Sequence, residues 1–78
     1  MSKKLARDLV PGDRVCTHRP ISRATVEEVR QSATEVKSKA GKYAHALLVI
    51  YRVDDSDYSR APLDSDFIHP DDYVETIR

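Results

Sequence analysis

Cys16 and His18 are the residues of this sequence whose types and spacing could perform covalent chemistry. Residues two apart on a strand point to the same side of a sheet, so His18 could activate the Cys16 thiol as a nucleophile. The sequence identifies no third residue that would orient this pair and no oxyanion site. A partly buried, unreactive thiol is therefore the expected role of Cys16, and we expect that the protein is not an enzyme.

Four residues could in principle supply zinc ligands, because imidazole and thiolate groups bind this metal. They are Cys16, His18, His45 and His69. Their spacing follows no standard zinc motif, so the sequence predicts no zinc site.

The acidic stretch that starts at Asp55 has offsets similar to parts of a calcium-binding loop. The sixth position of such a loop makes a sharp turn that requires glycine, and here it is Arg60. A solvated hairpin turn at residues 54–57 is the better interpretation, since aspartate tolerates turn geometry. The chain has only two glycines and no Gly-rich phosphate loop, so we expect no nucleotide and no other cofactor.

Basic residues are unevenly distributed along the chain. Residues 1–42 contain ten Lys/Arg against five Asp/Glu, whereas residues 43–78 contain three against eight. The basic set consists of Lys3, Lys4, Arg7, Arg14, Arg19, Arg23, Arg30, Lys37, Lys39 and Lys42. It could neutralise phosphates of RNA or DNA, or bind a protein partner. Alternatively, these cations are surface partners of Glu27, Glu28 and Glu35 in a domain whose two halves interleave.

Aromatic and acidic residues of the second half form another candidate partner-binding group. Its members are Tyr51, Asp54, Asp55, Asp57 and Tyr58. Tyrosines can stack on unpaired bases or, with Tyr43, Phe67 and Tyr73, surround a methylated cation. Packing in the core is the ordinary use of aromatic rings in a domain of this size.

With 78 residues the chain is expected to form one domain over residues 1–78, with modest stability. Its single cysteine cannot form an internal disulfide, and the basic start of the chain is not followed by the apolar segment of a secretory signal. We therefore expect a cytoplasmic protein that does not associate with membranes.

The elements that would position these residues are organised around residues 42–55. Their run of Leu, Val, Ile and Tyr is too short to span a membrane, and its β-branched and aromatic residues favour a central strand. Before it, Pro11-Gly12-Asp13 predicts a turn that leads into a strand over residues 14–18. After it, we expect a return strand over residues 58–63, a 3₁₀ turn at residues 69–72 and a last strand over residues 73–77.

Residues 22–41 fit two structures. As a helix, they place Val26, Val29, Ala33, Val36 and Ala40 at spacings of three and four, with a capping box at Thr25-Glu28 and Gly41 at the C-cap. As β structure, residues 24–30 form a strand and residues 32–41 a long polar loop, which is uncommon in compact domains. The stripe of Val and Ala alone is narrow for a helix.

The order of these segments resembles small SH3-like barrels. The matching pieces are residues 9–15, 25–29, 47–55, 62–67 and 74–77, which together cover most of the chain. The usual glycine after the Asp54-Asp55 pair is replaced, and the insertion at residues 31–42 is long and helix-like. The resemblance implies a β barrel or half-barrel, and such barrels occur in both nucleic-acid-binding and peptide-binding proteins.

We therefore expect a mostly-β domain, a small SH3-like barrel or half-barrel of about five strands, with one possible helix at residues 25–40. Its expected function is that of a non-enzymatic module for protein–protein interaction, as a bacterial or phage accessory or regulatory protein. The alternative is binding of RNA or DNA through the basic first half.

Overall fold

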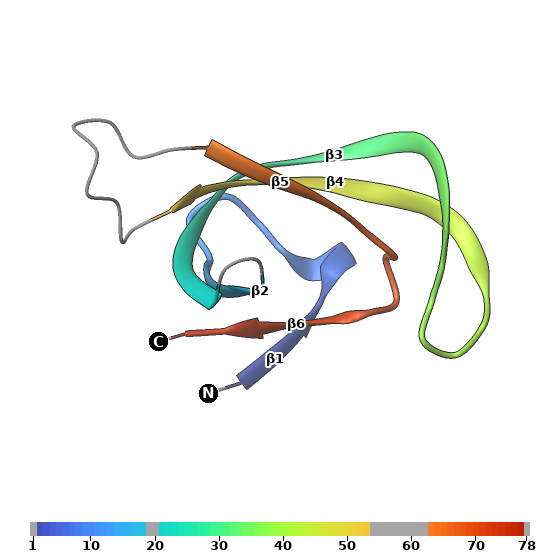
Figure 1. Cartoon of the computed structure of the whole chain (residues 1–78), viewed down its shortest axis with the longest axis horizontal. Helices are drawn as coiled ribbons and strands as arrows, with labels where there is room; N and C mark the ends of the chain where they lie inside the picture. Colours follow the sequence, from blue (N-terminus) through green and yellow to red (C-terminus); the bar gives the residue numbers. More distant parts are fainter. Residues whose placement is uncertain (1, 19–20, 54–62, 78) are drawn as a thin grey trace.

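The structure, a computed structural model, describes residues 2–18, 21–53 and 63–77, with only the backbone at residues 17, 18, 21 and 22. In chain order the elements are β1 (Ser2–Leu5), the 3₁₀ helix η1 (Ala6–Asp8), β2 (Arg14–His18), β3 (Ile21–Lys37), β4 (Tyr43–Val53), β5 (Leu63–Ile68) and β6 (Tyr73–Thr76). The strands form one open antiparallel sheet in the order β1-β6-β2-β3-β4-β5 (Figure 1). The predicted mostly-β fold is confirmed, with six strands where about five were expected.

The long hairpin of β3 and β4 dominates the sheet. The predicted central strand is β4, and β3 pairs with it from Ala24 to Lys37. A loop joins the two strands, where the Ser38 N–H donates to the Lys42 carbonyl (2.7 Å) and Gly41 has φ of +88°, which favours glycine. The helix considered for residues 25–40 is therefore wrong. The long polar loop considered for residues 32–41 is also wrong, because β3 continues to Lys37.

Two bulges explain why the sequence pattern of β3 was misleading. Val26 pairs with Tyr51 and Glu28 with Ile50, so Glu27 is an extra residue that reverses which side chains point inward. Val29 therefore lies on the same face as Val26, at a spacing of three that imitates a helix. A second irregularity lies between Gln31 and Glu35.

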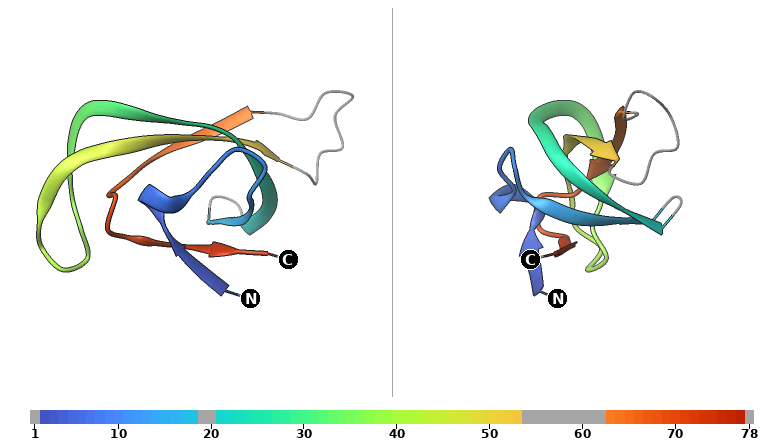
Figure 2. Two further views of the ribbon diagram at one scale, coloured as in Figure 1. Left: turned by 180° about the vertical axis from the view of Figure 1, so that it is seen from behind. Right: turned by 90° about the vertical axis from the view of Figure 1, so that its left-hand side faces the viewer.

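The inward faces of the strands make one small hydrophobic core. Its buried members are Ala6, Leu9, Val15, Ala24, Val26, Val49, Tyr51 and Val74, and Val29, Leu47 and Ile68 pack against them. The 3₁₀ helix η1 and strands β2 to β6 all contribute residues, because the sheet curls so that β1, β6 and β2 face the β3–β4 hairpin (Figure 2). Among the described residues, the largest completely buried side chains are the valines Val15, Val26 and Val49.

The two C-terminal strands lie in different parts of the sheet: β5 is next to β4, and β6 lies between β1 and β2. β5 pairs with β4 from Leu63 to Ile68; of the return strand expected over residues 58–63, residues 58–62 lie outside the described residues. The expected 3₁₀ turn at residues 69–72 is a turn closed by the Asp72 N–H and the His69 carbonyl (3.0 Å). The buried His69 ring stabilises it, since Nδ1 accepts from the Asp71 N–H (3.0 Å).

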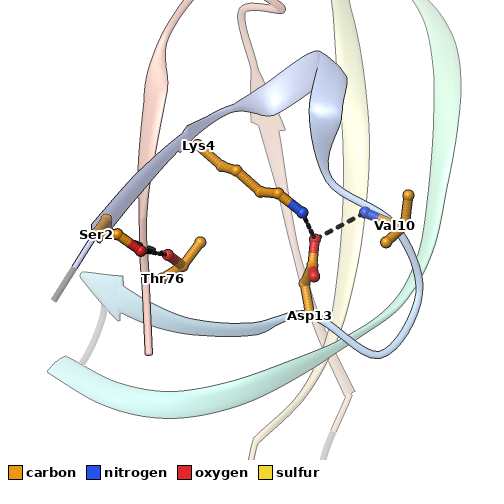
Figure 3. Close-up of polar contacts among 5 residues, drawn as sticks. All are labelled: Ser2, Lys4, Val10, Asp13 and Thr76. Carbon is orange, nitrogen blue, oxygen red and sulfur yellow. Dashed lines mark hydrogen bonds and ion pairs between the residues drawn. The ribbon is translucent and has the colours of Figure 1, made fainter. Parts of the chain in front are cut away.

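The turn before β2 is fixed by a carboxylate. Gly12 has φ of +96°, as the Pro-Gly pattern predicts, and the Asp13 N–H donates to the Val10 carbonyl (3.1 Å). Asp13 Oδ2 accepts from the Val10 N–H (3.0 Å) and from Lys4 Nζ (2.9 Å), which connects the turn to β1 (Figure 3). Burial opposes ionisation of Asp13, but the Val10 and Lys4 interactions outweigh it and hold the pKa of this carboxyl below its usual value.

We predict that Asp13→Asn lowers the free energy of unfolding by about 1 kcal/mol at neutral pH, the typical contribution of such a hydrogen bond. Because the folded-state pKa is depressed, the stabilisation is complete above the unfolded pKa of about 3.9 and is lost as pH falls through the folded value. Urea denaturation of both proteins across this range measures it. Asp8→Asn is the control, since Asp8 is an exposed carboxylate on η1. A stability difference between the wild type and Asp13→Asn that persists at low pH would contradict the assignment.

We predict that Val49→Ala lowers the free energy of unfolding by about 2 kcal/mol, because it leaves a cavity beneath the hairpin where Val49 is fully buried. Val10→Ala is the matched control, since Val10 is 53% exposed. Chemical denaturation followed by circular dichroism gives both values. Equal free energies of unfolding for the two variants would contradict the placement of Val49 in the core.

Candidate functional site

Several members of the predicted basic set have partners within the described part of the chain. Three of its members make ion pairs with carboxylates: Lys4–Asp13, Arg7–Asp71 and Arg30–Glu28. Lys37 lies over the ring of Tyr43, with Nζ 5.9 Å from its centroid. Arg14 also has an interaction partner, and Arg19 lies outside the described residues. Exposed pairs of this kind add little stability, but they neutralise the charge that would attract phosphates.

Glu28 and Arg30 illustrate this neutralisation. They are two apart on β3, on the outer face of the sheet, and Arg30 Nε lies 2.6 Å from Glu28 Oε1. The hydrogen bond and the charge of Glu28 raise the pKa of Arg30. On the same side of the hairpin, the bulge residue Glu27 pairs with Arg52 of β4 (2.5 Å). Glu28 is thus a partner of a cation of the basic set, as the alternative interpretation expected, whereas Glu27 pairs with Arg52, which lies outside that set.

Lys39 and Lys42 lie at the tip of the β3–β4 hairpin, and Lys3 of β1 lines the same pocket as they do. This tip bends back toward the β5–β6 connection, where the Lys39 N–H donates to Asp72 Oδ1 (3.2 Å) (Figure 1). A pocket of about 500 Å³ lies there, which we call the tip pocket; its lining includes Lys3, Lys39, Lys42, Asp72, Tyr73 and Glu75. Tyr73 is 64% exposed. Asp71 also lines the pocket, so its three acidic residues equal its three lysines in number and the pocket carries both signs of charge.

A second hollow, of about 650 Å³, lies between the hairpin and the segment around η1. Leu9, Val29, Leu47 and Pro70 give it apolar walls, and Arg7 and His45 are among its polar lining residues. Two residues of the predicted basic set, Arg7 and Arg30, also line this hollow, and each is paired with a carboxylate.

The outer face of β4 and β5 carries a patch of apolar side chains, which we call the β5 face: Leu48, Ile50, Leu63 and Phe67. The register pairs Leu48 with Phe67, Ile50 with Ser65 and Arg52 with Leu63, so these residues share the face that points away from the core. Leu63 is 61% exposed and Phe67 53%. Sequence analysis did not single out this patch; the alternation of Leu63, Ser65 and Phe67 was the signal that could have indicated it.

The inner face of β5 has the opposite character. Asp64 pairs with Tyr51 and Asp66 with Val49, so both carboxylates share the face of the core residues but remain exposed at its margin. Tyr51 is only 3% exposed. Burial raises the pKa of the Tyr51 hydroxyl, and the negative charges of Asp66 and Asp64 raise it further.

The predicted partner-binding group is only partly described. Asp54, Asp55, Asp57 and Tyr58 lie outside the described residues. The ring of Tyr51 belongs to the core, which is the packing role considered as its alternative. Cys16 is a half-buried free thiol, and the described residues contain no group of three His, Cys, Asp or Glu that could hold a metal ion.

Comparisons with known proteins add no further constraint. No family model, curated protein or solved structure matches this chain. The described part of the chain contains no helix with the length and hydropathy needed to cross a membrane. Among the described residues, β5 is the element that carries two of the exposed large hydrophobic side chains, Leu63 and Phe67.

Proposed function

We propose that this chain is a non-enzymatic binding module, a cytoplasmic accessory or regulatory protein that recognises another protein through the β5 face. The observation that supports this proposal is the exposure of Leu63 and Phe67 on one side of an edge strand, beside Leu48 and Ile50. Exposed apolar patches of this kind mark interaction sites more often than isolated apolar residues do.

The energetics favour a protein partner for this face. Burying a Leu or Phe side chain contributes about 1.5–3 kcal/mol, so two such residues are sufficient as the centre of a small interface. Arg52 and the Glu28–Arg30 pair lie around the apolar residues and give the face a polar rim. This arrangement, with an apolar centre and charges at its edge, is the usual composition of a protein interface.

We predict that the double variant Leu63→Ser, Phe67→Ser loses at least about tenfold in affinity for proteins captured from the source cell by the wild-type chain, because it removes the apolar centre. Affinity capture at physiological salt, with quantitation of each retained protein, measures the effect. Val10→Ser removes an equally exposed apolar residue outside the β5 face and should capture as the wild type does. Equal capture by the double variant would reject the β5 face as the interface.

A second candidate function is binding of RNA or DNA at the tip pocket. The observation that favours it is that Lys3, Lys39 and Lys42, from distant parts of the sequence, line one pocket with the exposed Tyr73. Phosphate neutralisation supplies most of the affinity for nucleic acids, and an exposed ring can stack on a base. Asp72 and Glu75 in the same pocket oppose this function, so it ranks second.

If the tip pocket binds single-stranded nucleic acid, Lys39→Ala with Lys42→Ala should reduce the slope of log K against log salt by about 1.4, the loss of two phosphate contacts. Fluorescence anisotropy with a labelled oligonucleotide measures this slope. The control is Arg30→Ala with Arg52→Ala, which removes the same charge from the outer face of the hairpin. Absence of binding by the wild type at low salt, or equal slopes for both variants, would reject this function.

A further inference from the structure

The β5 strand forms a free edge of the sheet. Among the described residues it pairs with β4 on one side only and is the last strand in the sheet order. An edge strand presents backbone N–H and C=O groups that can pair with a strand of another chain. Leu63–Ile68 is long enough for a partner strand to add several hydrogen bonds.

The two faces of this edge differ in chemistry. Leu63 and Phe67 point outward, whereas Asp64 and Asp66 lie on the face of Tyr51. All four side chains are exposed. Asp64 Oδ1 accepts from the Ser65 N–H (2.8 Å), but among the described residues neither Asp64 nor Asp66 makes an ion pair. A strand added here would therefore meet apolar side chains on one face and uncompensated negative charge on the other.

A second copy of this chain fits the edge poorly. Antiparallel pairing of two β5 strands about Ser65 would place Asp64 opposite Asp66, and like charges directly opposite each other destabilise a strand pair. The other edge of the sheet is β1, where Lys3 and Lys4 are adjacent and so point to opposite faces. Only one of them could meet the two aspartates, and Lys4 is already bound to Asp13.

We propose that the β5 edge binds an extended segment of another protein in which basic and apolar residues alternate. The basic side chains meet Asp64 and Asp66, the apolar side chains pack on Leu63 and Phe67, and the backbones form a strand pair. This inference rests on the proposed function and specifies its partner. The two carboxylates then determine which strand can bind, since they oppose pairing with a second β5 strand and favour a strand with basic side chains.

The test uses the full chain and a synthetic peptide of about seven residues, enough to span β5, in which lysine and valine alternate and both termini are blocked. The comparison peptide has the same composition with its lysines grouped in one half. We expect the alternating peptide to bind about tenfold more tightly, because two opposite-charge pairs and the apolar contacts require that order. Isothermal titration calorimetry gives both affinities, and NMR chemical shifts locate the peptide.

Variants separate the charge from the backbone. Asp64→Asn with Asp66→Asn should remove the preference for the alternating peptide and most of its salt dependence. Asp8→Asn with Glu35→Gln removes the same charge from other elements, where both side chains are exposed, and should leave the preference intact. An alternating peptide that is N-methylated at every second residue, on the side that pairs, should bind about tenfold more weakly, since it cannot donate to β5.

Equal binding of the alternating and grouped peptides, or shifts that map outside β4 and β5, would overturn the inference. So would self-association of the wild-type chain through β5, detected by sedimentation. These failures differ from failure of the proposed function. If the Leu63→Ser, Phe67→Ser variant loses cellular partners while peptide order has no effect, the β5 face binds a folded surface and only strand addition is rejected. If that variant retains its partners, the proposed function itself fails.

Discussion

The pairing of β3 with β4 is the constraint on which the rest of the fold depends. Val26 opposite Tyr51 and Val29 opposite Val49 make the middle of the core, and the bulge at Glu27 is what allows both valines of β3 to point inward. A one-residue shift in this register would move these side chains to solvent, so the core itself fixes the register. β2 and β5 then add on either side of a hairpin whose inner face is already defined.

The same hairpin determines where the candidate surfaces lie. Because β4 lies between β3 and β5, its inward residues build the core, and its outward residues Leu48 and Ile50 are left to form a surface with β5. Because the hairpin is longer than the other strands, its end extends past them and bends back, which brings Lys39 beside Asp72. The β5 face and the tip pocket are therefore consequences of one element, placed at different points along its length.

Much of the fold could be predicted from local patterns. The central strand, the Pro11-Gly12 turn and the strands at residues 14–18 and 73–77 follow from alternation and turn chemistry that need no distant contact. The full length of β3 could not be predicted, because the bulge at Glu27 changes the spacing of its apolar residues from two to three. The candidate surfaces were harder still to predict. Lys3 and Lys39 line one pocket, and Leu48 lies opposite Phe67, only because distant segments come together in the folded chain. The SH3-like resemblance stays a prediction.

The opposite charges of the two halves become meaningful only after folding. Arg7–Asp71 and Arg52–Glu27 connect the halves, and Lys4–Asp13 and Arg30–Glu28 neutralise charge within the first one. Outside these pairs residues 1–42 keep seven Lys/Arg against two Asp/Glu, and residues 43–78 keep two against seven, so the asymmetry between the halves persists. The charges left without such pairs in the described residues include Lys39 and Lys42 at the hairpin tip and Asp64 and Asp66 on β5. The two charges of an ion pair largely cancel each other's electrostatic potential. Two neighbouring like charges without a counter-ion repel each other, and their potential is not cancelled. Two adjacent carboxylates at a sheet margin therefore contribute little to folding, and a cation supplied from outside is what would compensate them.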